Sequence, residues 1–176
     1  MNNRVSRFDI KHNLETVVRR VNESGGPQVL PVSGAGYGLF ADRVYQPDGR
    51  TVVTYYGGER VPPGSTGDYI VEVGKDYDID GYAGFDVSTE KGRWINDTIP
   101  AEVNVRFERK GGRIRIVPIK RIEKGEQILW NYGPHYQRPW LMQRKCTTCS
   151  GNATLCEKNG GLIFCSVSCQ MKFHSL

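Results

Sequence analysis

Short β-forming runs separated by glycine-rich turns dominate the chain between residues 28 and 133. β-Branched and aromatic side chains fill residues 51–56, and apolar and polar residues alternate along 103–116, on both sides of Lys110-Gly111-Gly112. Such alternation is typical of half-buried strands and paired glycines of tight turns, so the second stretch predicts a β-hairpin. Twenty-one glycines among 176 residues also disfavour long helices, because a glycine costs up to ~1 kcal/mol inside a helix. The sequence therefore predicts a mainly β fold.

One segment near the N-terminus has a helical period instead. Within residues 9–23, apolar side chains recur at helical spacing at Ile10, Leu14, Val17, Val18 and Val21. The following Ser24-Gly25-Gly26-Pro27 is typical of a helix end. We therefore expect an N-terminal helical segment, residues 1–27, whose single helix packs against the rest of the chain.

The length and the apolar pattern limit the class of protein. With 176 residues, 38% of them hydrophobic, the chain is expected to form one globular domain with a small appendage. No apolar run approaches the ~20 residues that a membrane-spanning helix needs, and no apolar stretch follows the first residues as in a secretory signal. We therefore expect an intracellular protein.

The net charge of +5 hides two oppositely charged regions. Residues 48–102 hold 11 acidic and 5 basic residues, a net charge of −6, whereas residues 103–176 hold 4 acidic and 13 basic residues, a net charge of +9. An ordinary solubilising surface would explain this asymmetry. An acidic face for a basic substrate and a basic face for nucleic acid would explain it equally well, although no lysine- or arginine-rich tract identifies a nucleic-acid binder.

All five cysteines follow a linker at 134–145 that has two prolines and few aliphatic residues. Four of them form two closely spaced pairs, as in a tetrahedral zinc site: Cys146, Cys149, Cys165 and Cys169. Residues 146–176 are too few to fold on an apolar core alone, so a structural zinc ion would stabilise them. Disulfides are the alternative, which the odd number of cysteines and the lack of an export signal disfavour. Cys156 and His174 have no assigned role.

A glycine loop at residues 36–41 fits the loose dinucleotide-binding pattern GxGxxA. That pattern binds a dinucleotide only where it opens a helix within a β-α-β unit. Pro47-Asp48-Gly49 follows within nine residues and leaves no room for the helix. We therefore reject a dinucleotide site at this loop.

Four motifs follow one another in an order that is more specific than any one of them. They are the glycine loop at 36–41, the aromatic strand end at 55–59, the stretch 92–98 with Asn104 shortly after it, and residues 124–133. With these motifs in this order, the chain resembles the SET-domain protein lysine methyltransferases over residues 28–133. The cysteine segment 146–176 stands where that family has its post-SET zinc-binding module.

The resemblance implies a SET-like fold of small β-sheets with a knot-like crossing, spanning 28–133 as the catalytic domain and followed by a small C-terminal zinc module. It implies a protein lysine N-methyltransferase that uses S-adenosyl-L-methionine. The expected substrate is a histone tail or another basic lysine-containing peptide, and the expected location is the nucleus, as for a chromatin regulator. The basic C-terminal half is suited to contact nucleic acid or a nucleosome. One structural zinc ion completes the expected cofactors.

The roles of individual residues carry over from the resemblance. The cofactor-binding positions are Gly36, Tyr37, Gly38, Asn96 and Asp97. The catalytic residue is Tyr132, whose hydroxyl would lie near the methyl group and the target nitrogen. The walls of the lysine channel are Tyr55, Phe107 and Trp130. Each residue also has an ordinary alternative role: a tight turn for the glycines, a turn or cap for the asparagine, and core packing for the aromatic residues.

Three positions depart from the family pattern. Asp97 stands where histidine is usual, Ile99 where a zinc-binding cysteine often follows, and Trp130 where phenylalanine or tyrosine often sets how many methyl groups fit. Aspartate keeps only the backbone role of that histidine, and tryptophan either narrows the pocket or points elsewhere. These departures leave open a second function: a SET-like binding module or scaffold with little catalysis, which recruits partners through its zinc module.

Overall fold

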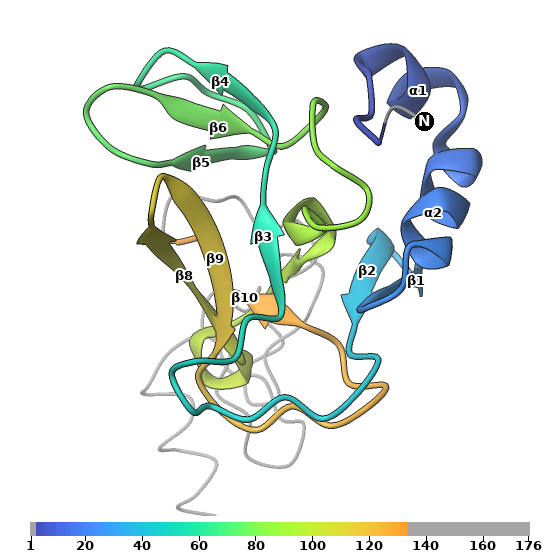
Figure 1. The fold of residues 1–176 in the computed structure, drawn as a ribbon, viewed down its shortest axis with the longest axis vertical. Coiled ribbons are helices and arrows are strands. Elements are labelled where there is room, and N and C mark those ends of the chain that lie inside the picture. Colours follow the sequence, from blue (N-terminus) through green and yellow to red (C-terminus); the bar gives the residue numbers. More distant parts are fainter. Residues whose placement is uncertain (1–2, 134–176) are drawn as a thin grey trace, which may run out of the picture. The chain divides into compact units, whose positions relative to one another are not determined.

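The computed structural model describes residues 3–133. The chain divides into two units: one comprises Met1–Asp97 and Val103–Trp130, and the other comprises Thr98–Glu102 and Asn131–Leu176, of which Gly133 is the last residue described. Within residues 3–133 there are ten short strands, two α-helices and two short 3-10 helices. The predicted mainly β fold is confirmed, with small and mostly antiparallel sheets (Figure 1).

The predicted N-terminal helix is divided in two, α1 (Arg7–His12) and α2 (Leu14–Glu23). It begins earlier than predicted because Ser6 and Asp9 form a capping box, in which each side chain accepts a hydrogen bond from the other residue's backbone N–H. It is interrupted at Asn13, whose φ of −135° and ψ of 33° are not helical. The predicted apolar face is the buried one, at Ile10, Val17, Val18 and Val21.

Three antiparallel sheets and one parallel strand pair make up the larger unit as far as it is described. The first sheet is the hairpin of β1 (Gln28–Val32) and β2 (Gly36–Phe40), and α2 packs against β1 (Figure 1). The second sheet has the order β4 (Glu59–Val61), β6 (Asp78–Asp80) and β5 (Ile70–Glu72).

The third sheet has the order β3 (Thr54–Tyr56), β9 (Arg113–Pro118) and β8 (Val105–Lys110). Its β8–β9 pair confirms the predicted hairpin. The two residues of the turn, Gly111 and Gly112, have φ angles of 60° and 74°. Both values lie in the left-handed region, which is why the tight turn has glycine at both positions.

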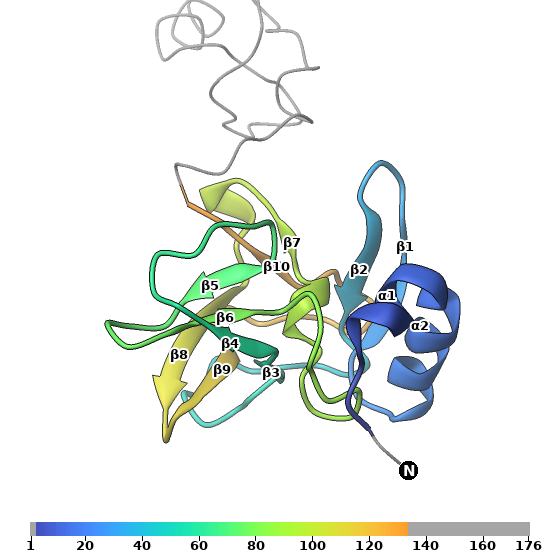
Figure 2. The ribbon, with the colours of Figure 1, turned by 90° about the horizontal axis from the view of Figure 1, so that it is seen from above.

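Residues 126–130 lie between two strands that are far from them in sequence. The first half of this segment runs beside the end of β2, where the Ile128 N–H donates to the Leu39 carbonyl at 2.8 Å. The second half is β10 (Leu129–Trp130), which pairs in parallel with β7 (Asn96–Asp97), as Figure 2 shows. Three of the four sequence motifs therefore meet along this segment.

A buried lysine joins the C-terminal end of α2 to the chain before β7. Lys91 is 1% exposed, and its ammonium donates hydrogen bonds to the backbone carbonyls of Val21 at 2.9 Å, of Pro27 at 3.1 Å and of Gly25. The last carbonyls of a helix have no partner within it, so a cation there is favourable. Burial lowers the pKa of Lys91 to about 8, and the charge of Asp42 opposes this shift.

We expect Lys91→Met to lower the free energy of unfolding by about 2–3 kcal/mol at neutral pH, because three carbonyls lose their donor. Between pH 8 and the ordinary lysine pKa of 10.5, the folded protein has released the Lys91 proton while the unfolded chain still holds it. This group therefore makes the wild type more stable as the pH rises through that range. Chemical denaturation should show the gap between wild type and Lys91→Met widening from pH 8 to 10.5, whereas Lys75→Met, at an exposed lysine, should change the stability little at neutral pH. A gap that stays constant with pH, or an equal loss of stability in both variants at neutral pH, would contradict this role.

Candidate functional site

The two glycines of the first motif are required for different reasons. Gly36 has a φ of 74°, in the left-handed region, with open space where a side chain would stand. Gly38 lies in the regular part of β2 but is closely packed: a Cβ there would lie 2.6 Å from Gln127 Nε2, 2.8 Å from Val32 Cγ2 and 3.0 Å from Asn96 Nδ2. The structure thus brings together Gly38 and Asn96, which the resemblance assigns to one cofactor site.

The side chain of Asn96 has an unused donor. Its Nδ2 atom is buried and has no hydrogen-bond partner among residues 3–133. The indole Nε1 of Trp94, in the 3-10 helix η1 (Gly92–Trp94), is likewise buried without a partner in the described part of the chain. A buried donor left unpaired costs about 1–3 kcal/mol. These two donors are therefore available to the acceptor groups of a ligand or of ordered water.

Tyr37 and Arg93 both contact the ring of Trp94. The rings of Tyr37 and Trp94 meet edge to face, with their centroids 5.9 Å apart. The guanidinium of Arg93 is buried, with its Cζ 4.7 Å from the Trp94 ring and 4.6 Å from the Tyr69 ring, and burial lowers its pKa. These contacts fix η1, which leads directly into β7 and so positions Asn96.

Gln127 is a site residue that the sequence did not single out. It lies opposite Phe40 in an isolated bridge, and its amide group is the nearest neighbour of the space above Gly38. Asn104 fixes its backbone: the Asn104 Nδ2 donates to the Gln127 carbonyl at 2.8 Å, and the Asn104 Oδ1 accepts from the Leu129 N–H at 2.8 Å. The only sequence signal for Gln127 is its position inside the motif at 124–133.

An aromatic row lies beside this site, on one face of the third sheet. Trp130 stacks on Phe107 with ring centroids 4.0 Å apart and planes 14° apart, and Phe107 contacts the Tyr56 ring at 5.6 Å. Two of the three predicted channel residues are therefore in contact. The sequence left open the direction of the Trp130 side chain. In the structure its ring lies flat against the Phe107 ring.

Tyr55, the third predicted channel residue, lies on the opposite face of the sheet. It pairs with Arg115, whereas Phe107 pairs with Ile116, and neighbouring residues of β9 point to opposite faces. The Tyr55 ring instead has the guanidinium Cζ of Arg113 at 4.6 Å. The structure does not bring Tyr55 together with Phe107, and Tyr56 takes that place.

Asp97 belongs to the larger unit and Tyr132 to the smaller one. Asp97 pairs with Trp130 across β7 and β10. Tyr132, which is partly buried, lies between two residues with defined bonds: the Asn131 Nδ2 donates to the Thr98 carbonyl at 2.8 Å, and the Gly133 N–H donates to the Asn131 Oδ1 at 2.9 Å. The segment around the predicted catalytic residue therefore has its own local framework.

The acidic residues of the central region have unequal exposure. Asp78 is 1% exposed, and its carboxylate accepts from the backbone N–H groups of Gly64 at 2.8 Å and Val73 at 3.2 Å, so it organises the second sheet. Asp76, two residues away, is exposed. Part of the net charge of −6 is thus structural and does not form an acidic face.

The four cysteines expected to bind zinc, and Cys156 and His174, lie outside the described residues. Residues 3–133 contain no group of His, Cys, Asp and Glu side chains that could hold a metal ion. Among the same residues no helix has the length and apolar character to cross a membrane.

No protein-family model matches the chain, and no match was found among curated proteins.

Proposed function

We propose that the protein is an S-adenosyl-L-methionine-dependent protein lysine N-methyltransferase. The observation that carries the proposal is the packing of Gly38 against Asn96, whose buried Nδ2 has no partner among residues 3–133. Three of the motifs that resemble SET-domain enzymes meet at this point, although long stretches of chain separate them. Such a meeting is expected if they bind one ligand together.

The residues present suit the amino-acid end of this cofactor, which has a carboxylate. The Asn96 amide and the Trp94 indole offer buried donors, and hydrogen bonds to a charged acceptor are the stronger kind. Gly36 has open space where a side chain would stand, which allows a ligand to approach its backbone, whereas Gly38 leaves room for the Asn96 and Gln127 side chains. Asp97 would contribute through its backbone in β7. When bound, the cofactor supplies a methyl group on a positively charged sulfur.

The chain's own residues would hold the lysine and keep water away from it. Phe107 and Trp130, which are partly buried and stack on each other, offer an apolar wall for the lysine side chain, and the buried Tyr56 ring supports Phe107 from the core. An apolar environment disfavours the charged form of an amine, and a lysine must lose its proton before its nitrogen can attack. The Tyr132 hydroxyl would orient that nitrogen, which is the main requirement of a transfer that needs alignment more than covalent help.

The proposed substrate is a lysine in a basic peptide, with a histone tail as the first choice and the nucleus as the site of action. The acidic residues that remain exposed, such as Asp76 and Asp68, would favour a basic partner. The basic C-terminal half would contact nucleic acid or a nucleosome. Within the β8–β9 hairpin, Arg106 pairs with Glu108, Arg109 donates to the Val73 carbonyl and Arg113 lies on the Tyr55 ring. The exposed Lys110 is therefore the better candidate for such a contact.

The test is incubation of the full chain with core histones and S-adenosyl-L-methionine, followed by mass spectrometry of the histones. We expect added methyl groups on lysine residues, and none when the demethylated cofactor product replaces the cofactor. Calorimetry with the cofactor alone, taken together with this transfer assay, separates the two functions considered. Cofactor binding without any transfer would favour the binding module, and no binding at all would overturn the cofactor site.

We also expect one structural zinc ion, held by Cys146, Cys149, Cys165 and Cys169. Two short-spaced thiolate pairs can close a tetrahedral site, and a segment of this length needs such a ligand to fold. Metal analysis after purification without chelator should give about one equivalent of zinc per chain. A quadruple Cys→Ser variant should bind none, whereas Cys156→Ser should retain the metal. Zinc below about half an equivalent in the wild type would contradict the assignment.

A further inference from the structure

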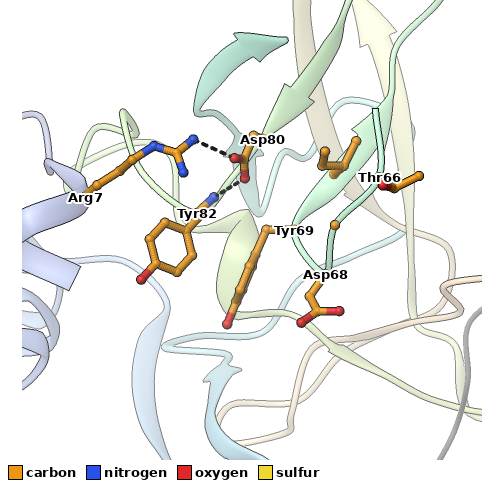
Figure 3. Close-up of a pocket in the computed structure, with 8 residues that line it drawn as sticks. Arg7, Thr66, Asp68, Tyr69, Asp80 and Tyr82 are labelled. Carbon is orange, nitrogen blue, oxygen red and sulfur yellow. Dashed lines mark hydrogen bonds and ion pairs between the residues drawn. The ribbon is translucent and has the colours of Figure 1, made fainter. Parts of the chain in front are cut away.

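A pocket lies between α1 and the loop that leads into β5, and its lining includes none of the residues of the candidate cofactor site. Its volume is about 280 Å³, and Figure 3 shows the residues around it: Arg7, Thr66, Asp68, Tyr69, Asp80 and Tyr82. The rings of Tyr69 and Tyr82 stand edge to face, with their centroids 5.7 Å apart. The pocket therefore has an aromatic wall and two carboxylates.

The guanidinium of Arg7 already contacts one tyrosine and one carboxylate of the pocket. The guanidinium of Arg7 lies 5.7 Å from the Tyr82 ring centroid and donates to Asp80 Oδ2 at 2.8 Å and to Glu59 Oε2 at 2.9 Å. The Arg7 side chain is 55% exposed, so this arrangement forms at the open edge of the pocket. It demonstrates that carboxylate and tyrosine side chains here can hold a cation from the chain itself.

The Asp68 side of the pocket is different. The buried guanidinium of Arg93 lies 4.6 Å from the Tyr69 ring centroid and 5.6 Å from the Tyr82 ring centroid, but it forms no ion pair with Asp68. Asp68 is exposed and has no ion-pair partner among residues 3–133. Its carboxylate lies beside Tyr69, and Figure 3 shows both side chains pointing to the same side of the pocket. Counting Glu59 at the edge of the pocket, three carboxylates stand against two guanidiniums, that of Arg7 and that of Arg93 against the tyrosine rings. Asp68 is the carboxylate that forms no ion pair with either, which favours a cationic ligand over an anionic one at Asp68.

We propose that this pocket binds the cationic side chain of one arginine or lysine of a partner peptide, between Asp68 and the two tyrosine rings. The aromatic wall would receive the apolar stem of the side chain and Asp68 its charge. This binding needs neither the cofactor nor methyl transfer, so it stands independently of the proposed activity. If the peptide is also the substrate, the pocket selects a basic residue elsewhere in the peptide than the methylated lysine.

The probes are N-acetyl-arginine amide, N-acetyl-lysine amide and N-acetyl-citrulline amide, the last a neutral analogue with the shape of arginine. Each is added to the ¹⁵N-labelled full chain, and amide shifts are followed by NMR. We expect concentration-dependent shifts at Gly67, Asp68, Tyr69 and Tyr82 with the arginine or lysine probe and none with citrulline. Equal shifts with citrulline, or no shifts at these residues with either cation, would overturn the proposal.

Two substitutions separate a binding role from a structural one. Asp68→Asn should weaken cation binding about two- to five-fold, as expected for loss of a partly exposed ion pair, whereas Asp76→Asn, at an exposed aspartate outside the pocket, should not. Arg7→Gln should tighten binding, because it frees Asp80 and removes the competing charge. Tighter binding is not expected from a purely structural role of Arg7. Unchanged affinity in both pocket variants would overturn the proposal.

Discussion

Replacing Gly38 with alanine is expected to weaken the binding of S-adenosyl-L-methionine about 10- to 100-fold, the amount expected for loss of one hydrogen bond to a charged group. The added Cβ would lie 2.8 Å from Val32 Cγ2 and 3.0 Å from Asn96 Nδ2. The amide of Gln127 can rotate away, but the methyl group of Val32 belongs to the paired β1 strand. We therefore expect Asn96 to move, so that its donor no longer meets the ligand. Gly38→Val should have the larger effect.

Calorimetry measures the affinity, and thermal unfolding checks that the fold is retained. Gly67→Ala is the matched control: a Cβ at Gly67 would have its nearest neighbour at 3.4 Å, an ordinary contact, and its φ is not in the left-handed region. Asn96→Asp is a second test, since it replaces the amide donor with a negative charge of the same shape and should repel a carboxylate. If Gly38→Ala and Asn96→Asp both keep the wild-type affinity, the cofactor site lies elsewhere.

Local signals in the sequence predicted the elements whose pattern is complete within a few residues. The β8–β9 hairpin needs only alternation and two glycines that accept a left-handed φ, and both are visible. The early start of the N-terminal helix also has a local cause, the capping box of Ser6 and Asp9, and the helix divides at Asn13, whose backbone is not helical. The apolar period of residues 9–23 continues through the break, which is why period alone predicted a single helix.

The face of a strand was harder to predict. Residues 51–56 read Thr-Val-Val-Thr-Tyr-Tyr and do not alternate, so the pattern does not decide which of the last two tyrosines points inward. The register of β3 with β9 decides it, because it pairs Tyr56 with Ile114 and Tyr55 with Arg115. A change of one residue moves a side chain to the other face of a sheet. This is why Tyr56, and not Tyr55, contacts Phe107.

The contacts that build the candidate site depend on pairings that no local pattern reports. The resemblance to SET-domain enzymes implied that Gly38 and Asn96 share a site, and the structure brings them together. Gln127 and Asn104 could not be assigned, because their positions depend on the backbone bonds of residues 126–130 with two distant strands. Lys91 and Asp78 are charged residues in buried positions, and composition alone places charged residues at the surface.

The second large effect is expected at Tyr132, where Tyr132→Phe should lower the rate of methyl transfer about 10²- to 10³-fold, as for removal of one hydrogen-bonding group that acts in the transition state. Cofactor affinity should stay near the wild-type value, since phenylalanine keeps the ring and removes only the hydroxyl. The rate constant should fall with little change in the KM for the peptide, which distinguishes lost transition-state stabilisation from lost substrate binding. Tyr77→Phe is the control, because Tyr77 belongs to none of the four motifs. Its ring centroid lies 4.4 Å from the guanidinium Cζ of Arg60, a residue of the second sheet. Activity of Tyr132→Phe within a few-fold of wild type would show that another group orients the lysine, and the catalytic role of Tyr132 would have to be abandoned.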